Sequence, residues 1–163
     1  MLKMSLDKVD VKILEILQEQ GDISNVELSK KVGLSPSPCL ARVRFLKSEG
    51  YIKSYVGLVD PIKVGLKLNI FIHVTLEKQV KSILNSFEEA ISSRSEVMEC
   101  YLMTGESDYL LRVVVPDLND LEHFIMNFLS KLDGVGNIKS SFALKQVKYK
   151  TNLPIQSDNL KSL

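Results

Sequence analysis

The first fifty residues repeat apolar side chains every three or four positions, which predicts a run of amphipathic helices. Residues 7–20 carry four apolar residues at this spacing: Val9, Ile13, Ile16 and Leu17. Ser24 and Glu27 then have the Ser-x-x-Glu spacing of a capping box, in which both side chains satisfy free amides at a helix start. A short second helix that ends near Gly33 is therefore expected.

A third helix is predicted to begin at Ser35-Pro36, because Ser is a good N-cap and Pro at the first helical position costs no hydrogen bond. Its expected buried stripe is Leu40, Val43 and Leu46, with Cys39 beside it. The residues expected in other directions are Arg42, Arg44, Phe45 and Lys47. Two short helices joined by a glycine-containing turn are typical of a helix-turn-helix.

In a helix-turn-helix the second helix enters the major groove of DNA, while nearby cations and amides hold phosphates. Residues 51–55 predict a short strand after this helix, which gives a winged variant with Lys53 near the DNA backbone. The candidate DNA-binding residues are Ser24, Asn25, Ser35, Pro36, Ser37, Pro38, Arg42, Arg44, Lys47 and Lys53. Which of them meet bases and which meet phosphates stays open, as does a plain three-helix packing unit with solvated cations.

The rest of the chain alternates between strand-like and helix-like patterns. Apolar residues alternate over 68–76, which predicts a half-buried strand. The predicted elements are a strand at 68–76, a helix at 80–91, a hairpin of 97–104 and 109–115, a helix at 118–132 and a strand at 138–149. This βαββαβ order is the ferredoxin-like split motif, so the predicted fold class is α+β, with a winged helix-turn-helix domain followed by a ferredoxin-like domain.

A sheet of this type has helices on one face only. Phe71, His73 and Thr75 are expected on the free face if Ile70 and Ile72 face the helices. A second copy of the domain would bury that face, and a two-fold dimer also suits a palindromic DNA site. At least a homodimer is therefore predicted.

The predicted hairpin turn is a candidate site for a small ligand. Gly105 lets backbone amides point outward to a carboxylate, and Asp108 can accept hydrogen bonds from an ammonium group. Together these groups would hold an amino acid. The alternative is that Gly105 and Asp108 serve turn geometry alone.

Charge limits how the chain would bind DNA. The 163 residues include 21 Lys or Arg and 20 Asp or Glu, a net charge of +1, so the whole molecule has no strong field for nucleic acid. The first 55 residues hold nine basic and seven acidic residues. Within residues 35–55 four cations face only Glu49, which makes a small local basic patch.

Composition predicts a folded protein in two small domains. The predicted layout is a helix-turn-helix domain at 1–55, a connector with a short strand at 56–66, a ferredoxin-like domain at 67–150 and a tail at 151–163, whose residues 156–163 are expected to be loosely ordered. No apolar run reaches the roughly 18 residues of a membrane span. The two cysteines lack metal or redox spacing, so reduced thiols and a cytoplasmic location are expected.

Several segments of the first domain, in the same order along the chain, closely resemble the leucine-responsive regulatory protein family, also called Lrp/AsnC. The similar segments are Leu6-Asp7, Asp10, Ile23 to Ser29, Val32 to Cys39, Arg42 to Arg44 and Gly50 to Ile52. The resemblance continues over nearly the whole chain. It implies a transcriptional regulator of a prokaryotic cytosol and nucleoid that binds double-stranded DNA and forms dimers, tetramers or octamers through the second domain, called RAM.

The same resemblance implies an amino-acid effector bound between neighbouring dimers, at the interface of their RAM domains. Thr104 to Tyr109 is similar to the family's Gly-x-x-Asp-Tyr loop, and the last strand contributes further contacts. Ile138 departs from the polar residue expected there. Leu102 and Phe142 would line an apolar pocket, which favours leucine, another branched residue or methionine. The candidate effector residues are Leu102, Thr104, Gly105, Glu106, Ser107, Asp108, Tyr109, Ile138, Ser140 and Phe142.

The sequence also bears on two other classes of protein, an enzyme and an adaptor. An enzyme is not expected, because the sequence has no phosphate loop, nucleophile motif or metal cluster, and no cofactor is implied. A metabolite-sensing adaptor without specific DNA binding is the alternative, motivated by the small charge excess. Binding to DNA would distinguish the two, since a DNA regulator loses affinity steeply as salt rises.

Overall fold

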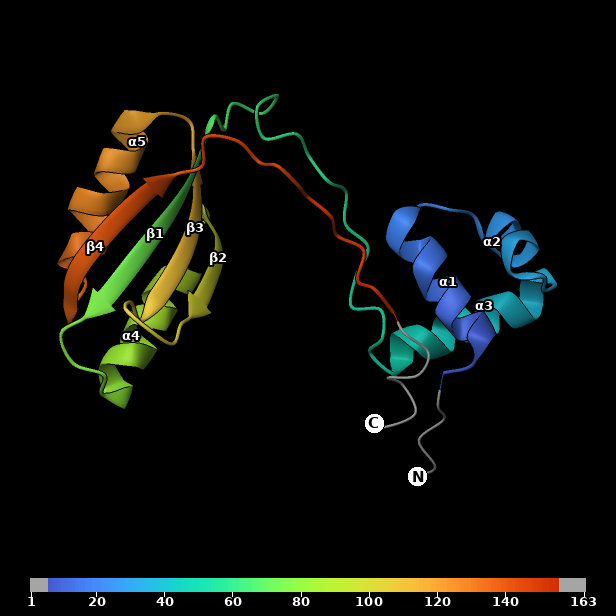
Figure 1. Ribbon diagram of the computed structural model, residues 1–163. Coiled ribbons are helices and arrows are strands. Elements are labelled where there is room, and N and C mark those ends of the chain that lie inside the picture. Colours follow the sequence, from blue (N-terminus) through green and yellow to red (C-terminus); the bar gives the residue numbers. More distant parts are fainter. Residues whose placement is uncertain (1–5, 156–163) are drawn as a thin grey trace. The chain divides into compact units, whose positions relative to one another are not determined.

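The computed structural model describes residues 6–155 and divides into two compact units (Figure 1). The first unit contains the chain up to Leu58 together with the C-terminal segment from Lys148, and the second contains Val59–Val147. The predicted loosely ordered tail, residues 156–163, lies outside the described residues. That residues 148–155 belong to the first unit was not expected from the sequence.

Three helices form the first unit: α1 (Lys8–Glu19), α2 (Asn25–Val32) and α3 (Pro36–Ser48). The predicted capping box of Ser24 and Glu27 is present, and Asp7 and Asp10 form a second one at the start of α1. Gly33 ends α2 with a φ of 75°, a left-handed conformation that favours glycine. The buried core is Ile13, Leu14, Leu17, Leu28, Val32, Cys39 and Leu46.

Two expectations for this unit are wrong. Leu40 was placed in the buried stripe of the third helix, but its side chain is 38% exposed, and Cys39 and Leu46 supply the fully buried contacts. The strands expected at residues 51–55 and in the connector are not formed, and 61–65 is a turn. A strand needs a ladder of backbone hydrogen bonds to a neighbour, and among the described residues no such ladder joins 51–60 to another segment.

The second unit is a four-stranded antiparallel sheet with helices on one face. Its elements are β1 (Leu68–Leu76), α4 (Lys81–Ser92), β2 (Val97–Leu102), β3 (Tyr109–Val115), α5 (Leu118–His123), which continues as wider and tighter turns over Phe124–Phe128 and Leu129–Lys131, and β4 (Val135–Phe142). The strand order β2-β3-β1-β4 confirms the ferredoxin-like prediction.

The last strand is shorter than predicted. It was expected to reach Tyr149, but β4 ends at Phe142, which pairs with Ile70. The amide of Ala143 still donates to the carbonyl of Asn69 at 3.4 Å, close to the first residue of β1. Beyond this point β1 offers no further partner, so strand pairing stops.

The faces of β1 are as predicted. Ile70, Ile72 and Val74 are fully buried against a cluster that includes Phe87 and Leu121 from the helices. On the other face Phe71, His73 and Thr75 are only partly buried. No described helix is long and apolar enough to cross a membrane.

Candidate functional site

The exposed side of α3 is the candidate surface for DNA. Ser37, Ala41 and Arg44 follow one another at spacings of three or four, and all three are exposed. Leu40 adds an apolar contact on the same side. This side combines a hydroxyl, a cation and small apolar groups, which is the mixture that base edges in the major groove accept.

The start of α3 also leaves its hydroxyls free. Ser35 is the N-cap residue, as predicted, but its side chain makes no capping hydrogen bond. Pro36 and Pro38 have no N–H to donate. The exposed hydroxyls of Ser35 and Ser37 are therefore the polar groups that the first turn of α3 presents.

Arg42, in contrast, is held inside the unit. Its Nη1 atom donates to Asp7 Oδ2 at 2.6 Å and to Asp10 Oδ1 at 2.8 Å, so it ties α3 to the start of α1. Arg42 comes three residues after Cys39 and four before Leu46, which places it on the inner side of α3. Arg42, a candidate DNA-binding residue, is thus directed toward α1, whereas Arg44 is exposed.

This ion pair changes the titration of its members. The hydrogen bonds with Asp10 and then Asp7, with their charges, raise the pKa of Arg42. Partial burial alone would raise the pKa of Asp7, but the amide of Asp10 and the Arg42 guanidinium outweigh it and lower the pKa. Both groups therefore stay charged around neutral pH, which keeps the link between α1 and α3.

Two more candidate residues are used within the fold. Ser24 Oγ donates to Glu27 Oε2 at 2.9 Å and accepts from the Glu27 amide at 3.2 Å. Asn25 Nδ2 donates to the carbonyl of Pro36 at 2.9 Å, which fixes the turn between α2 and α3. These side chains position the recognition helix rather than reaching away from the unit.

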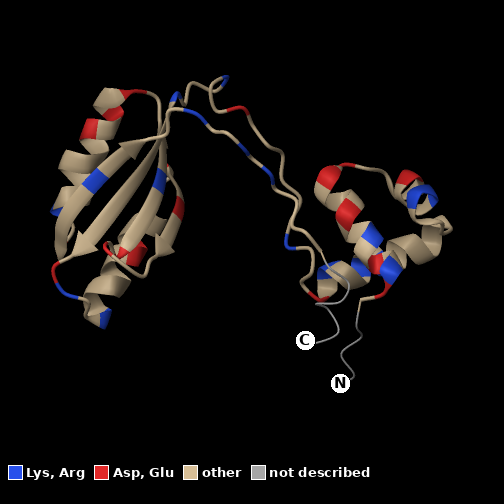
Figure 2. Ribbon diagram, in the orientation of Figure 1, with Lys and Arg blue, Asp and Glu red and all other residues tan. Residues whose placement is uncertain are grey.

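Charges of both signs are spread over the three helices (Figure 2). Lys47 lies over the ring of Tyr55, with its Nζ atom 4.5 Å from the ring centroid, and Lys53 is exposed. Burial raises the pKa of Tyr55, so its ring packs on the unit as a neutral group. Helix α3 itself carries cations and no acidic residue, and Arg44 and Lys47 on this helix are exposed.

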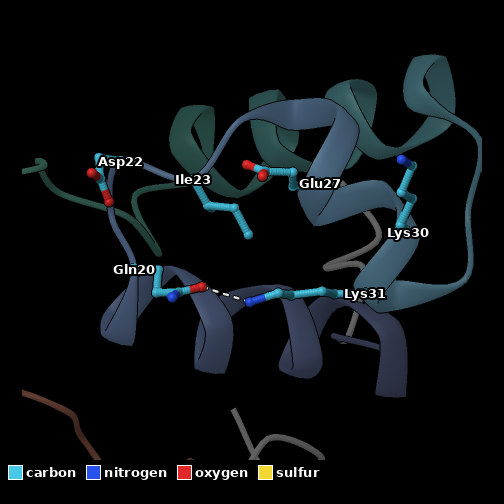
Figure 3. A pocket seen from close by; sticks show the side chains of 6 residues that line it. All are labelled: Gln20, Asp22, Ile23, Glu27, Lys30 and Lys31. Carbon is cyan, nitrogen blue, oxygen red and sulfur yellow. Dashed lines mark hydrogen bonds between the residues drawn. The ribbon is translucent and has the colours of Figure 1, made fainter.

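A depression of about 440 Å³ lies between the end of α1 and α2 (Figure 3). Lys31 Nζ donates to Gln20 Oε1 at 2.6 Å across it. Its lining residues are Gln20, Asp22, Ile23, Glu27, Lys30 and Lys31. Two acids and two lysines offset each other here, and Glu27 is already held by Ser24, so the depression has no evident preference for an ion.

The hairpin loop of the second unit is tightly anchored to the end of β1. The amide of Met103 donates to the carbonyl of Asp108 at 2.8 Å, and the amide of Asp108 donates to the carbonyl of Val74 at 2.9 Å. His73 Nδ1 lies 3.2 Å from Ser107 Oγ. Gly105 has a φ of 126°, which requires glycine, and Thr104 and Glu106 are exposed beside it. The loop therefore presents its tip in a fixed conformation.

Asp108 lies at the base of this loop and is only 7% exposed. Its Oδ2 accepts a hydrogen bond from the Leu76 amide at 2.6 Å, and its Oδ1 accepts from Gln79 Nε2 at 2.5 Å. None of the ion pairs among the described residues includes Asp108. The carboxylate is thus held by neutral donors alone. The part of Gln79 in this arrangement was not anticipated, and no spacing in the sequence indicates it.

Tyr109, a candidate effector residue, has its side chain in the core of the second unit. Its ring is 1% exposed and lies 4.5 Å from the ring of Phe87, while its hydroxyl donates to Glu88 Oε1 at 2.8 Å. Burial and then the neighbouring Glu88 raise the pKa of Tyr109 well above its ordinary value. Tyr109 is a core residue with a satisfied hydroxyl.

The candidate residues of β4 do not meet the loop side of β2 within one chain. Ile138, Ser140 and Phe142 pair with Val74, Ile72 and Ile70 of β1, so they share the helix-covered face. Leu102 lies on β2, at the opposite edge of the sheet. Three strand spacings, about 14 Å, separate these two edges. The predicted pocket between Leu102 and Phe142 is therefore not formed by a single chain.

Comparison with known proteins gives this arrangement a family. Residues 6–53 match a family model described as a winged helix-turn-helix DNA-binding domain, and residues 69–153 match the model of the Lrp/AsnC ligand binding domain. The chain belongs to the Lrp/AsnC family. It is a transcriptional regulator with a DNA-binding helix-turn-helix domain and a ligand-binding domain, as the resemblance implied.

Named relatives of this Lrp/AsnC regulator cover nearly its whole length. It is 44% identical over 150 residues to the Bkd operon transcriptional regulator of Pseudomonas aeruginosa, covering 92% of this chain and 98% of that protein. It is 39% identical to the leucine-responsive regulatory protein of Escherichia coli strain K12, covering 93% of each chain. Both relatives are named as regulators.

Solved structures agree with the fold of this Lrp/AsnC regulator. A transcriptional regulator of Neisseria meningitidis in complex with L-methionine has a TM-score of 0.89 at 43% identity, covering 92% of this chain and 97% of that one. Escherichia coli AsnC has a TM-score of 0.80 at 25% identity, covering 93% and 100%. Both the helix-turn-helix and the ferredoxin-like domain are thus shared with known regulators.

Proposed function

We propose that this regulator binds duplex DNA through the exposed side of α3 and that an amino acid at the hairpin loop changes its affinity for DNA. The proposed effector site rests on the surroundings of Asp108. Its carboxylate is buried, its hydrogen-bond donors among the described residues are neutral, and it lies at the base of an exposed loop that contains Gly105. A buried charge is costly unless a counter-charge compensates it, and an ammonium group supplies one.

The chemistry of the loop suits an α-amino acid. The ammonium group would take the place of the Gln79 amide at Asp108 Oδ1, while Leu76 keeps its hydrogen bond to Oδ2. The carboxylate would accept from backbone amides beside Gly105, where no Cβ blocks the approach. The L-methionine of the Neisseria meningitidis relative supports an apolar amino acid as the ligand class.

A second copy of the chain completes the proposed site. Leu102 and Phe142 are 65% and 50% exposed, at opposite edges of one sheet, so an apolar pocket between them needs two chains. The partly buried face with Phe71 and His73 offers another surface for self-association. We therefore propose a homo-oligomer of at least two chains, which acts on DNA in the prokaryotic cytosol, at the nucleoid, without a catalytic role.

Calorimetric titration with L-methionine tests the effector site. The variant Asp108→Asn keeps an oxygen for the Leu76 amide but removes the negative charge, so it separates charge from folding better than alanine does. We expect its affinity for L-methionine to fall at least tenfold, about 1.4 kcal/mol. Glu122→Gln is the control, because Glu122 is an exposed carboxylate of the same unit, on α5, and is not a candidate effector residue. Equal binding by Asp108→Asn and wild type would refute the site.

Fluorescence anisotropy with a duplex selected from random-sequence DNA tests the DNA surface. Arg44→Ala should cost about 1 to 3 kcal/mol if Arg44 reads a base, and Lys53→Ala should weaken all sequences alike and reduce the salt slope by about one. Lys81→Ala, on α4 of the other unit, is the control. Weak association that ignores both salt and sequence would instead support the adaptor alternative.

A further inference from the structure

The chain returns to the helix-turn-helix unit after β4. We define residues 148–155 as the C-terminal strap, which belongs to the first unit. The Leu153 amide donates to Gln18 Oε1 at 2.7 Å, and Gln18 Nε2 donates to the Leu153 carbonyl at 3.2 Å. The side-chain amide of Gln18 thus pairs with Leu153 as a second peptide group would, and it satisfies both backbone groups of that residue.

The strap lies in a groove that the connector also lines. A cavity of about 760 Å³ is bounded by α1, by residues 51–58 and by the strap. Ile155 packs against the core of the unit, and the Tyr55 ring lies 3.4 Å from where a Cβ on Gly21 would be. The segment that leads into β1 and the segment that leaves β4 are therefore anchored on the same surface of the first unit.

The other ends of these segments also meet. Phe142 at the end of β4 pairs with Ile70 near the start of β1, and the Ala143 amide donates to the Asn69 carbonyl. The segment that leaves β4 therefore departs from the second unit next to the segment that enters β1. Residues 143–147 lead from β4, which carries Ile138, Ser140 and Phe142, to the strap.

Helix α1 links the strap to the recognition helix. Gln18 lies in its last turn and Asp10 in its first turn, and Asp10 and Asp7 both hold Arg42 of α3. The helix core between them is buried, with Ile13 and Leu14 inside. Helix α1 thus connects the strap to α3 through an ion pair at one end and a packed core along its length.

We propose that the C-terminal strap is the coupling element of this regulator, and that docking of Leu153 on Gln18 passes the state of β4 through α1 to α3. In this proposal the strap exchanges between a docked and a released arrangement, which the exposure of Thr151 and Leu153 allows. The effector arm of this proposal rests on the amino-acid site proposed above. Reciprocity requires that L-methionine change the affinity for DNA by the same factor as DNA changes the affinity for L-methionine.

The variant Gln18→Ala removes both hydrogen bonds to Leu153, and Gln20→Ala is its control, because Gln20 contacts Lys31 instead of the strap. The measured quantity is the ratio of DNA Kd without and with saturating L-methionine. We expect a ratio of about fivefold or more in wild type and Gln20→Ala. In Gln18→Ala it should fall below about twofold, with L-methionine affinity by calorimetry unchanged. A wild-type ratio in Gln18→Ala would overturn the proposal.

A second readout works without an effector. If neither L-methionine nor L-leucine binds the wild-type chain, the effector site fails, while the strap is still tested by hydrogen exchange with and without the selected duplex. DNA should change exchange over residues 148–155 in wild type and leave it unchanged in Gln18→Ala. The variant Leu153→Pro lacks the N–H that donates to Gln18 Oε1. Because residue 153 lies outside the helices, this variant should fold and behave like Gln18→Ala. No change in wild type would overturn the coupling role.

Discussion

Among the described residues, each unit buries one carboxylate to nearly the same extent, but the two carboxylates have partners of different charge. Asp10 of the first unit is 5% exposed and Asp108 of the second is 7% exposed. Asp10 has an internal cation, with Arg42 Nη1 at 2.8 Å. Within residues 6–155, the side chain of Asp108 has as hydrogen-bond partners only the Leu76 amide and the Gln79 side-chain amide. Burial is therefore not what distinguishes them, whereas the charge of the partner is.

We propose that this difference separates a structural group, Asp10, from a ligand-binding group, Asp108. A buried carboxylate with its own cation is complete, and it holds two helices together. A buried carboxylate with neutral donors has unused capacity for a cation that comes from outside. Asp10 and Arg42 thus hold the helix-turn-helix together, and Asp108 is the carboxylate that we propose for a ligand.

The variant Arg42→Ala would make Asp10 resemble Asp108, and it should have the largest effect on stability. Asp10 would remain buried without a cation, so the free energy of unfolding of the first unit should fall by about 2 to 3 kcal/mol, less than for a fully buried pair because Arg42 is partly exposed. Urea unfolding followed by circular dichroism measures this. Arg44→Ala, which changes an exposed residue, should stay within about 0.5 kcal/mol. Similar losses in both variants would contradict the structural role of Arg42.

The variant Gln79→Lys performs the reverse change and gives Asp108 an internal cation. A tethered ammonium competes at high effective concentration with the ammonium of a free amino acid. The affinity for L-methionine should therefore fall about tenfold, close to 1.4 kcal/mol. Calorimetric titration measures it.

The companion variant Gln79→Ala should instead raise the affinity for L-methionine. It removes the amide that the ligand has to displace from Asp108, and one such hydrogen bond has a net value of about 0.5 to 1 kcal/mol, or two- to fivefold in affinity. If Gln79→Lys and Gln79→Ala had the same effect, the ammonium group would not bind at Asp108.

The variant Tyr109→Phe tests whether the role of Asp108 extends to its neighbour. It removes the hydroxyl that donates to Glu88, so stability should fall by about 1 kcal/mol, measured by urea unfolding. The affinity for L-methionine should stay the same, because the ring of Tyr109 lies in the core. A selective loss of L-methionine binding would return Tyr109 to the effector site.

The smallest expected effect is the loss of stability at acidic pH. Asp7 and Glu27 both have lowered pKa values, Asp7 because the Asp10 amide and Arg42 outweigh burial, and Glu27 through its hydrogen bonds with Ser24. A lowered pKa in the folded state stabilises the fold above the ordinary values of 3.8 and 4.5, and this contribution is lost as pH falls below them. Thermal unfolding from about pH 6 to pH 3 should show this loss in wild type and less of it in Arg42→Ala.

Much of the fold follows from local pattern. The period of three to four in α1, the Ser24 and Glu27 capping box and the alternation over 68–76 each depend on neighbouring residues, and all three elements formed as predicted. The missing strands at 51–55 and in the connector failed for a non-local reason, because a strand exists only where another strand pairs with it. The spacing of Arg42 from Cys39 and Leu46 was in the sequence and already placed it on the inner side of its helix.

The sequence by itself determined the order of elements, the two-domain layout and the family, since periodicity, caps and family motifs are local properties of the chain. The tertiary structure decided which polar residues remain available for ligands. Asp7 with Arg42, Gln79 with Asp108 and Gln18 with Leu153 are separated by 35, 29 and 135 positions. Such pairs form only when packing brings distant segments together, because hydrogen bonds and ion pairs depend on distance in space.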